Sequence, residues 1–256
     1  MTIWEGNMKR AVKVFDDGRD RILSISLAEV GQPFRKIVRR SNAKPTGKYP
    51  SWKTGTTHQW ESIPERNAFR FLDAWPKARA FSAQSVEIKY VLRGEVHHHY
   101  PDILVELYGS SEMWEVKTRK FSMEHSIVER SVFLSMELPK HGYQYKVVVA
   151  EDIAQEPRFS TISRLLDLGR QNVPLVERER FRRLIDQGAV MTWGELTNGK
   201  FGAKARGYVA RLILEGELDI DWESGLRHEG RIRQPGSGDV LSRQLPGIPN
   251  GTGSQS

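Results

Sequence analysis

The chain has 256 residues, no cysteine, and 39 Lys and Arg against 32 Asp and Glu residues. This length holds one large domain or two small ones, and the lack of cysteine excludes disulfides, thiolate zinc sites and cysteine nucleophiles. The positive charge favours a polyanionic partner, with nucleic acid first and an anionic membrane surface second, although it fits a merely basic soluble protein about equally well.

Membrane spans and a signal peptide are not expected. No apolar run approaches the roughly 20 residues that cross a bilayer. Residues 1–20 alternate charged with apolar side chains and lack the apolar core of a signal peptide. We therefore expect a cytoplasmic protein.

The first 58 residues predict a short strand at Ile22–Leu27 and then an irregular basic arm. Residues 35–58 combine many cations and turn formers with almost no acids. Phosphate contacts from such an arm would give affinity without sequence specificity, and a solvated lead-in is the alternative. The expected contacts are Arg35, Lys36, Arg39, Arg40, Lys44, Lys48 and Lys53.

Residues 59–157 alternate between helical and strand patterns. A helix is predicted at 62–74, with Ser62 as N-cap, Glu65 at the capping-box spacing and Pro76 as the stop. The patterns that follow predict strands at 86–92, 96–107 and 113–118, a helix at 122–138 and a buried strand at 145–150. This order predicts a mixed α/β fold.

After Pro157 the pattern becomes mainly helical and then ends in a hairpin. The predicted helices are at 160–168, 177–187, 192–196 and 203–215, and the predicted strands are near 217–222 and 226–232. Helices followed by a terminal hairpin are typical of a winged-helix domain. The domain limits that follow are 1–58, 59–157 and 158–233, with a Gly/Pro/Ser-rich tail at 234–256 that we expect to be disordered.

Cations also gather around the last predicted helix. A winged helix would place this helix in a DNA major groove, and docking of a partner protein is the close alternative. The residues concerned are Lys200, Lys204, Arg206 and Arg211.

The pattern that carries chemistry is Pro101-Asp102 followed, after a turn, by Glu115-Val116-Lys117. Hydrolysis of a phosphodiester needs charge neutralisation and an activated water, which Mg²⁺ provides when carboxylate and carbonyl oxygens hold it. Asp102 and Glu115 fall on adjacent predicted strands. Glu115 and Lys117 point to one face while Val116 points into the core, and its carbonyl is an extra ligand. The alternative is a surface strand with alternating charges.

Glu65 is the next candidate, because it shares a helical stripe with Ala68, Phe69 and Leu72. A carboxylate on that face needs a partner, which a metal would supply. A capping-box role and competition from Glu61 are the alternatives.

Three consecutive histidines, 97–99, also suggest metal binding. Neighbours on a strand alternate faces, so the three cannot chelate one ion, although His97 and His99 can share a face beside the site.

These motifs resemble those of the TnsA family, the endonuclease subunit of heteromeric bacterial cut-and-paste transposases. The resemblance covers about residues 45–150. It rests on the basic lead-in, on WESIPER in the first long helix, and on Gln84 after it. It continues with YPDILVE, WEVK and YKVVVAED.

The resemblance implies a restriction-endonuclease-like mixed sheet flanked by helices, with a C-terminal winged helix. It implies Glu65 as a catalytic acid, Asp102 as a metal ligand, and a Gln or Glu at the position of Glu115, followed by the Lys of Lys117. It further implies Mg²⁺, with Mn²⁺ as a substitute, in one or two copies. Such a protein cuts the 5′ strands at transposon ends, with an integrase-type transposase and an ATP-dependent regulator as partners.

Two other functions compete with this interpretation. One is a stand-alone restriction or repair nuclease of the same fold, and the other is a non-catalytic DNA-binding subunit. The complete set of Asp102, Glu115 and Lys117 argues against the second, because a decayed site usually loses an acid.

Overall fold

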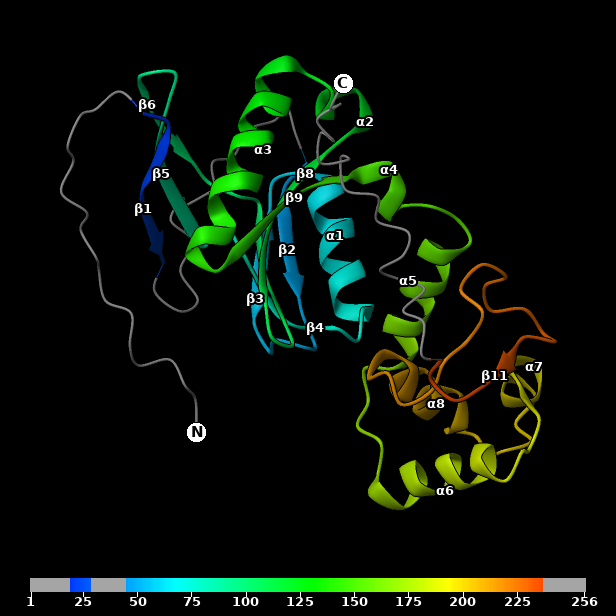
Figure 1. The fold of residues 1–256 in the computed structure, drawn as a ribbon. Coiled ribbons are helices and arrows are strands. Elements are labelled where there is room, and N and C mark those ends of the chain that lie inside the picture. The colour runs from blue at the N-terminus through cyan, green and yellow to red at the C-terminus, as the bar shows by residue number, and fades with distance from the viewer. Residues whose placement is uncertain (1–18, 29–44, 237–256) are drawn as a thin grey trace, which may run out of the picture.

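The computed structural model describes residues 19–28 and 45–236, with a four-stranded mixed sheet in its N-terminal half (Figure 1). Its strands, in spatial order, are β4 (Ala78–Ala83), β7 (Ile103–Leu107), β8 (Ser111–Lys117) and β9 (Tyr143–Val149). The pairs β4–β7 and β7–β8 are antiparallel, and β9 is parallel to β8. A parallel pair needs a long crossover, which the helical segment between β8 and β9 provides.

Helices pack against one face of this sheet. They are α1 (Ile63–Ala74) and α4 (Ala150–Ile153), and α5 (Arg158–Leu168) packs on α1. Ser62 caps α1, as predicted, and the predicted stripe of Ala68, Phe69 and Leu72 is fully buried. This apolar stripe fixes the rotation of α1 and so directs its first turn toward the sheet.

A short hairpin packs on α1. Its strands are β2 (Gly47–Pro50) and β3 (Thr57–Trp60). The ring centroids of Tyr49 and His58 lie 6.0 and 5.6 Å from that of Phe69. The prediction of an irregular arm is therefore wrong for residues 47–58. Strand β2 has four residues, and only Tyr49 among them is buried, so its sequence shows almost no alternation of apolar and polar residues.

The other face of the central sheet is covered by a second sheet and a long helix. These elements are β1 (Arg21–Leu27), β5 (Val86–Leu92), β6 (Glu95–His99) and α3 (His125–Glu137). The three strands are antiparallel in the order β1-β5-β6. Ile88, Met113 and Leu134, which have no exposed surface, belong to the apolar cluster that joins these layers. The predicted strands at 22–27 and 86–92 are confirmed.

The predicted strand at 96–107 is in fact two strands in different sheets. β6 ends at His99 and β7 begins at Ile103, with Pro101 between them. Proline has no N–H to donate to a sheet, so pairing stops there. The break places Asp102 at the beginning of β7, beside β8. Strand β4, which pairs with β7, was not predicted.

The predicted helix at 122–138 is also divided. α2 (Arg119–Ser122) ends before α3, because Glu124 has extended backbone angles of φ −64° and ψ 133°. A 3-10 turn, η1 (Leu138–His141), follows α3 and ends at Gly142, whose φ of 85° favours glycine.

The C-terminal half contains three further helices, seen at the lower right of Figure 1. The elements are α6 (Leu175–Asp186), β10 (Met191–Thr192), α7 (Trp193–Thr197), α8 (Ala205–Leu214) and β11 (Arg231–Ile232). The predicted helices are present, but the predicted terminal hairpin is wrong. Strand β11 pairs with β10 instead, and a single bridge joins Asp219 to Arg233.

One apolar cluster extends across residue 157. It includes Phe71 of α1 and Trp114 of β8, continues through Ile162 of α5 and reaches Leu212 of α8. The helices and sheets described above confirm the mixed α/β class. The restriction-endonuclease-like fold, the winged helix and the domain limits stay predictions.

Two sequence predictions lie outside the described residues. These are the phosphate contacts of Arg35, Lys36, Arg39, Arg40 and Lys44, and the tail from residue 237 onward. Within the described ranges, no helix is both long enough and apolar enough to cross a membrane.

Candidate active site

The carboxyl group of Asp102 is fixed where β7 meets β8. Its Oδ2 accepts a hydrogen bond of 2.7 Å from the backbone N–H of Val116. Its backbone carbonyl accepts a hydrogen bond of 3.0 Å from the backbone N–H of Gln84. The register of the strands, in which Ile103 is opposite Trp114, therefore brings Asp102 to Glu115 and Val116.

Strand β8 presents the next three candidates with the expected alternation. Val116 is buried in the cluster that contains α1, and Glu115 and Lys117 lie on the opposite face. The Glu115 residue is only 4% exposed, whereas the Lys117 side chain keeps 26% of its surface. A solvated strand with alternating charges does not bury its glutamate in this way.

Another acid on β8 gives a useful contrast. Glu112 is 3% exposed, but it accepts hydrogen bonds from the indole of Trp114 at 2.7 Å and from Lys146 at 2.6 Å. Its burial is therefore explained by partners that lie beside it, and it needs no further ligand.

The ammonium of Lys117 is the point on which the predicted oxygen donors converge. Its Nζ lies 2.7 Å from Oε1 of Glu115, 3.7 Å from Oδ2 of Asp102 and 3.5 Å from the carbonyl oxygen of Val116. Three of the four groups predicted as metal ligands, the carboxylates of Asp102 and Glu115 and the carbonyl of Val116, thus surround one cation, and Glu65 is the fourth.

Glu65 lies in the first turn of α1 and is 8% exposed. Its Oε1 accepts a hydrogen bond of 2.8 Å from the Ser62 hydroxyl, and its Oε2 accepts one of 3.0 Å from the Glu61 N–H. The capping interaction is therefore present, but with the amide of Glu61 in place of the Ser62 amide. Burial raises the pKa of Glu65, and the charge of Lys117 acts in the opposite direction.

The acids of this cluster oppose one another's ionisation. Burial and the charge of Glu115 raise the pKa of Asp102 to about 8, against a lowering effect of Lys117. Glu65 contributes to the same rise. Burial acts to lower the pKa of Lys117, but the charges of Asp102 and Glu115 outweigh it and raise that pKa. Lys117 and Arg130 of α3 bring two positive charges to three carboxylates, so the fully ionised cluster favours additional positive charge.

The residues behind Glu115 were not predicted as a group. The guanidinium of Arg130, on α3, donates to Oε1 of Glu115 at 3.1 Å. Nε2 of His99 lies 3.3 Å from Oε2 of Glu115 and 3.0 Å from the hydroxyl of Tyr145. Burial lowers the pKa of His99 to about 4, so the ring is neutral at pH 7.

Signals for two of these residues are present in the sequence. Arg130 interrupts the stripe formed by Ile127, Ser131 and Leu134, which are the buried residues of α3. A cation inside such a stripe needs an internal partner. His99 was predicted to lie beside the site, whereas His98 points away and binds Glu87 at 2.9 Å.

The donor set suits a hard divalent cation. Two carboxylates and one carbonyl oxygen are the ligand types that Mg²⁺ and Mn²⁺ take. In the described part of the chain, however, no group of three or more His, Cys, Asp and Glu side chains is arranged to hold a metal. In this structure the Lys117 ammonium contacts both of these carboxylates.

Two of the predicted DNA-binding residues are engaged inside the protein. Lys53 donates to the carbonyls of Leu72 and Trp75, at 2.7 and 2.6 Å, at the C-terminal end of α1. The guanidinium of Arg211 lies 3.9 Å from the ring centroid of Trp52, and its side chain is only 14% exposed. Both side chains therefore have internal partners in this structure, and their DNA contacts stay predictions.

The other predicted contacts in the described ranges differ in exposure. Lys48, Lys200 and Lys204 are exposed, Arg206 is half-buried, and Lys200 pairs with Glu195. DNA binding by these four residues stays a prediction.

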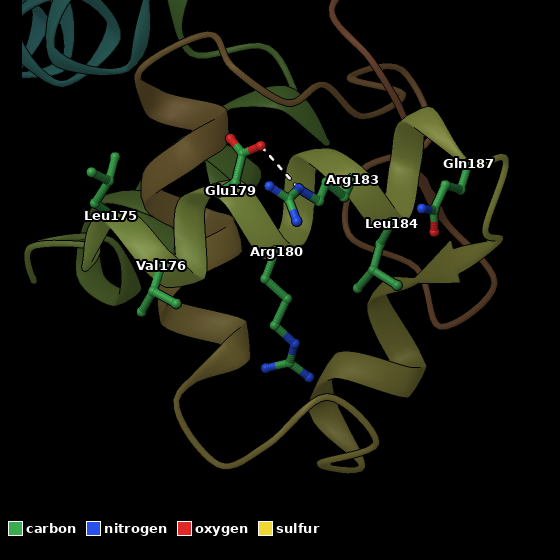
Figure 2. Close-up of a pocket in the computed structure, with 7 residues that line it drawn as sticks. All are labelled: Leu175, Val176, Glu179, Arg180, Arg183, Leu184 and Gln187. Atoms are coloured by element: carbon green, nitrogen blue, oxygen red, sulfur yellow. Dashed lines mark hydrogen bonds and ion pairs between the residues drawn. The ribbon is translucent and has the colours of Figure 1, made fainter.

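A groove lies on a different part of the molecule, along α6 (Figure 2). It has a volume of about 850 Å³. Its lining residues are Leu175, Val176, Glu179, Arg180, Arg183, Leu184 and Gln187. All belong to α6 or its C-cap, so the groove is separate from the acidic cluster.

Comparison of the sequence with models of protein families and with curated proteins gives no match.

Proposed function

We propose that this chain is a metal-dependent DNA endonuclease. The observation that supports the proposal best is the convergence of Asp102, Glu115 and the Val116 carbonyl on the Lys117 ammonium. Buried carboxylates with raised pKa values mark functional sites more often than structural ones. The formal net charge of +7 is consistent with a polyanionic substrate.

In the proposed reaction, water attacks a backbone phosphorus and a sugar oxygen leaves. Asp102, Glu115 and the Val116 carbonyl would hold Mg²⁺ or Mn²⁺, which supplies charge neutralisation and a more acidic water. Lys117 orients the attacking water through its ammonium and stabilises negative charge on the phosphate. Glu65 is at the edge of the same cluster, where its carboxylate supports the water or a second ion.

We further propose that the nuclease is a TnsA-like subunit that cuts 5′ strands at transposon ends. The support is the order of motifs in the sequence, from WESIPER through YPDILVE to WEVK. An integrase-type transposase and an ATP-dependent regulator are the partners that this proposal requires. A stand-alone restriction or repair nuclease is the alternative within the same chemistry.

For the C-terminal half we propose a winged-helix arrangement. The supporting observation is the order α6-β10-α7-α8-β11, together with the pairing of β11 to β10 and the bridge from Asp219 to Arg233. In a winged helix, α8 would be the recognition helix. Exposed Lys204 precedes α8, and half-buried Arg206 lies in its first turn.

The proposal is tested by nicking of supercoiled plasmid DNA with Mg²⁺ or Mn²⁺, in the presence and absence of a partner transposase. Asp102→Asn and Glu115→Gln are expected to lower cutting by at least 100-fold, because each removes a ligand charge. Glu112→Gln is the matched control, since Glu112 is equally buried on the same strand but binds Trp114 and Lys146.

Each outcome of this experiment has a defined meaning. Cutting that survives both Asp102→Asn and Glu115→Gln would contradict the site. Cutting by the chain alone at many sequences would favour the stand-alone nuclease. Specific cutting at transposon ends only with the partner would favour the TnsA-like subunit.

A further inference from the structure

Arg130 is the cation of the cluster that the proposed reaction does not use. It belongs to α3, on the opposite side of Glu115 from α1, and its side chain keeps 24% of its surface. Its guanidinium donates to Oε1 of Glu115 at 3.1 Å and interacts electrostatically with the hydroxyl of Tyr145 on β9. Arg130 therefore faces both the glutamate and the neighbouring strand.

The two carboxylate oxygens of Glu115 have different surroundings. Oε1 accepts from both Lys117 and Arg130, at 2.7 and 3.1 Å. Oε2 makes no hydrogen bond to any described residue, although Nε2 of His99 lies 3.3 Å from it. The contacts of Oε1 therefore set the rotation of the whole carboxylate.

Lys117 and Arg130 differ in their other partners. The Lys117 ammonium also contacts Asp102 and the Val116 carbonyl, so it has to move or share its partners when a metal enters. Arg130 has its second partner in Tyr145, which is 6% exposed and belongs to the sheet. Arg130 is therefore the contact that can persist in both states.

We propose that Arg130 is a positioning residue that keeps Oε1 of Glu115 directed toward Asp102 and Lys117, ready for a divalent cation. The inference rests on the proposed nuclease function and adds to it a residue outside the ligand set. Partners of metal ligands usually change metal affinity by about 10- to 100-fold when they are lost.

The charge of Arg130 has the opposite effect from its hydrogen bond. A guanidinium beside a metal ligand repels the ion, so charge alone predicts tighter metal binding when Arg130 is removed. Positioning predicts weaker binding. The sign of the change in metal affinity therefore separates the two roles.

The experiment measures Mn²⁺ affinity by electron paramagnetic resonance in the full-length protein. Arg130→Gln is expected to weaken Mn²⁺ binding by about 10-fold or more, and Arg130→Lys is expected to recover part of it, because Lys keeps the charge without the planar fork. Tyr145→Phe removes the hydroxyl that interacts with Arg130 and is expected to give a smaller loss. Arg93→Gln is the matched control, because Arg93 also pairs with a glutamate, Glu129 of α3.

A second readout separates positioning from a general loss of structure. Nicking by Arg130→Gln is expected to need a higher Mn²⁺ concentration for half-maximal rate and to approach the wild-type rate at saturation. Circular dichroism and thermal unfolding without metal establish that each variant is folded, and a misfolded Arg130→Gln leaves Arg130→Lys and Tyr145→Phe to decide.

The inference is overturned if folded Arg130→Gln binds Mn²⁺ as tightly as the wild type, or more tightly. The proposed function would still stand in that case. If the wild type shows no Mn²⁺ binding that depends on Asp102, the proposed function fails and the role of Arg130 falls with it.

Discussion

Asp102 combines features that rarely occur at one carboxyl group. It is fixed by the N–H of Val116, its side chain keeps only 17% of its surface, and it faces other acids. These surroundings raise its pKa to about 8, so the group is largely protonated at pH 7 without a bound cation. Ionised Asp102 therefore destabilises the metal-free fold, and a cation that binds it relieves this cost.

The first prediction concerns the stability of metal-free protein with Asp102→Asn. The folded-state pKa is raised above the unfolded one, so stability from the protonated group is full below pH 4 and is lost as pH rises through about 8. Between pH 5 and 8 the free energy of unfolding of the variant should rise, relative to that of the wild type, by at most about 1.4 kcal/mol per pH unit. Urea unfolding in EDTA measures this difference, and a pH-independent difference would contradict the raised pKa.

Lys53 shows the opposite case at the C-terminal end of α1. Burial lowers its pKa to about 7, and the charge of Asp73 only partly opposes this. A neutral amine still has two N–H groups for the carbonyls of Leu72 and Trp75. Asp73 in turn accepts hydrogen bonds from Tyr49 and Ser51, so the hairpin is held to the helix by polar contacts.

The second prediction is the pH dependence of Lys53→Met. Below about pH 7 both states of the wild type are protonated, and the folded state must bury an ammonium. As pH rises toward 10.5, only the unfolded state holds the proton, so wild-type stability rises. The free energy of unfolding of the wild type, measured with urea, should therefore rise relative to that of Lys53→Met as pH increases from 6 to 9. Lys48→Met, an exposed change in the same hairpin, should show no such shift.

At the scale of elements, the first turn of α1 links helix capping to the site. The hydroxyl of Ser62 accepts from the N–H of Glu65 at 3.3 Å and donates to its carboxylate at 2.8 Å. The same residue therefore begins the helix and orients the acid. A capping role and a catalytic role for Glu65 are compatible, because its two oxygens bind locally while its charge reaches Asp102.

The third prediction is for Ser62→Ala. Loss of an N-cap hydroxyl should lower the free energy of unfolding by about 1 kcal/mol. Cutting should fall as well, because Glu65 loses one of its two hydrogen bonds. Ser62→Thr keeps the hydroxyl and should keep both properties. Thermal unfolding and the nicking assay check this, and normal activity in Ser62→Ala would separate Glu65 from the reaction.

At the scale of the whole molecule, a single apolar cluster joins the two halves of the chain. Ile162 and Leu165 of α5 have no exposed surface and share this cluster with residues of α1 and α8. In addition, Arg70 of α1 donates to Ser163 of α5 at 3.3 Å. We therefore expect the described halves to unfold together.

The fourth prediction is that Ile162→Ala lowers the stability of the whole chain by about 2–5 kcal/mol. The loss should appear equally in far-UV dichroism and in tryptophan fluorescence, in one transition. Leu175→Ala removes an apolar side chain that is 80% exposed, and it should change stability by less than about 0.5 kcal/mol. Two separate transitions in Ile162→Ala would show that the halves are independent.

The sequence alone predicted the elements with strong local signals and four residues of the cluster, Glu65, Asp102, Glu115 and Lys117, but not Arg130. α1 was predictable because Ser62, the apolar stripe and Pro76 all act within a few residues of one another. The positions of Glu115, Val116 and Lys117 followed from strand alternation, which is also local. A break at Pro101 could also be predicted from the local sequence, but the strand-forming residues on both sides of the proline favoured one continuous strand.

Only the tertiary structure decided which distant side chains meet. Arg130 and His99 come to Glu115 from α3 and β6, which lie 15 and 16 positions away in the chain. Lys53 turned inward because the hairpin packs on α1 and its amine satisfies open carbonyls at the helix end. The physical reason is that long-range pairing depends on burial and hydrogen bonding across elements, and no local period in a sequence records it.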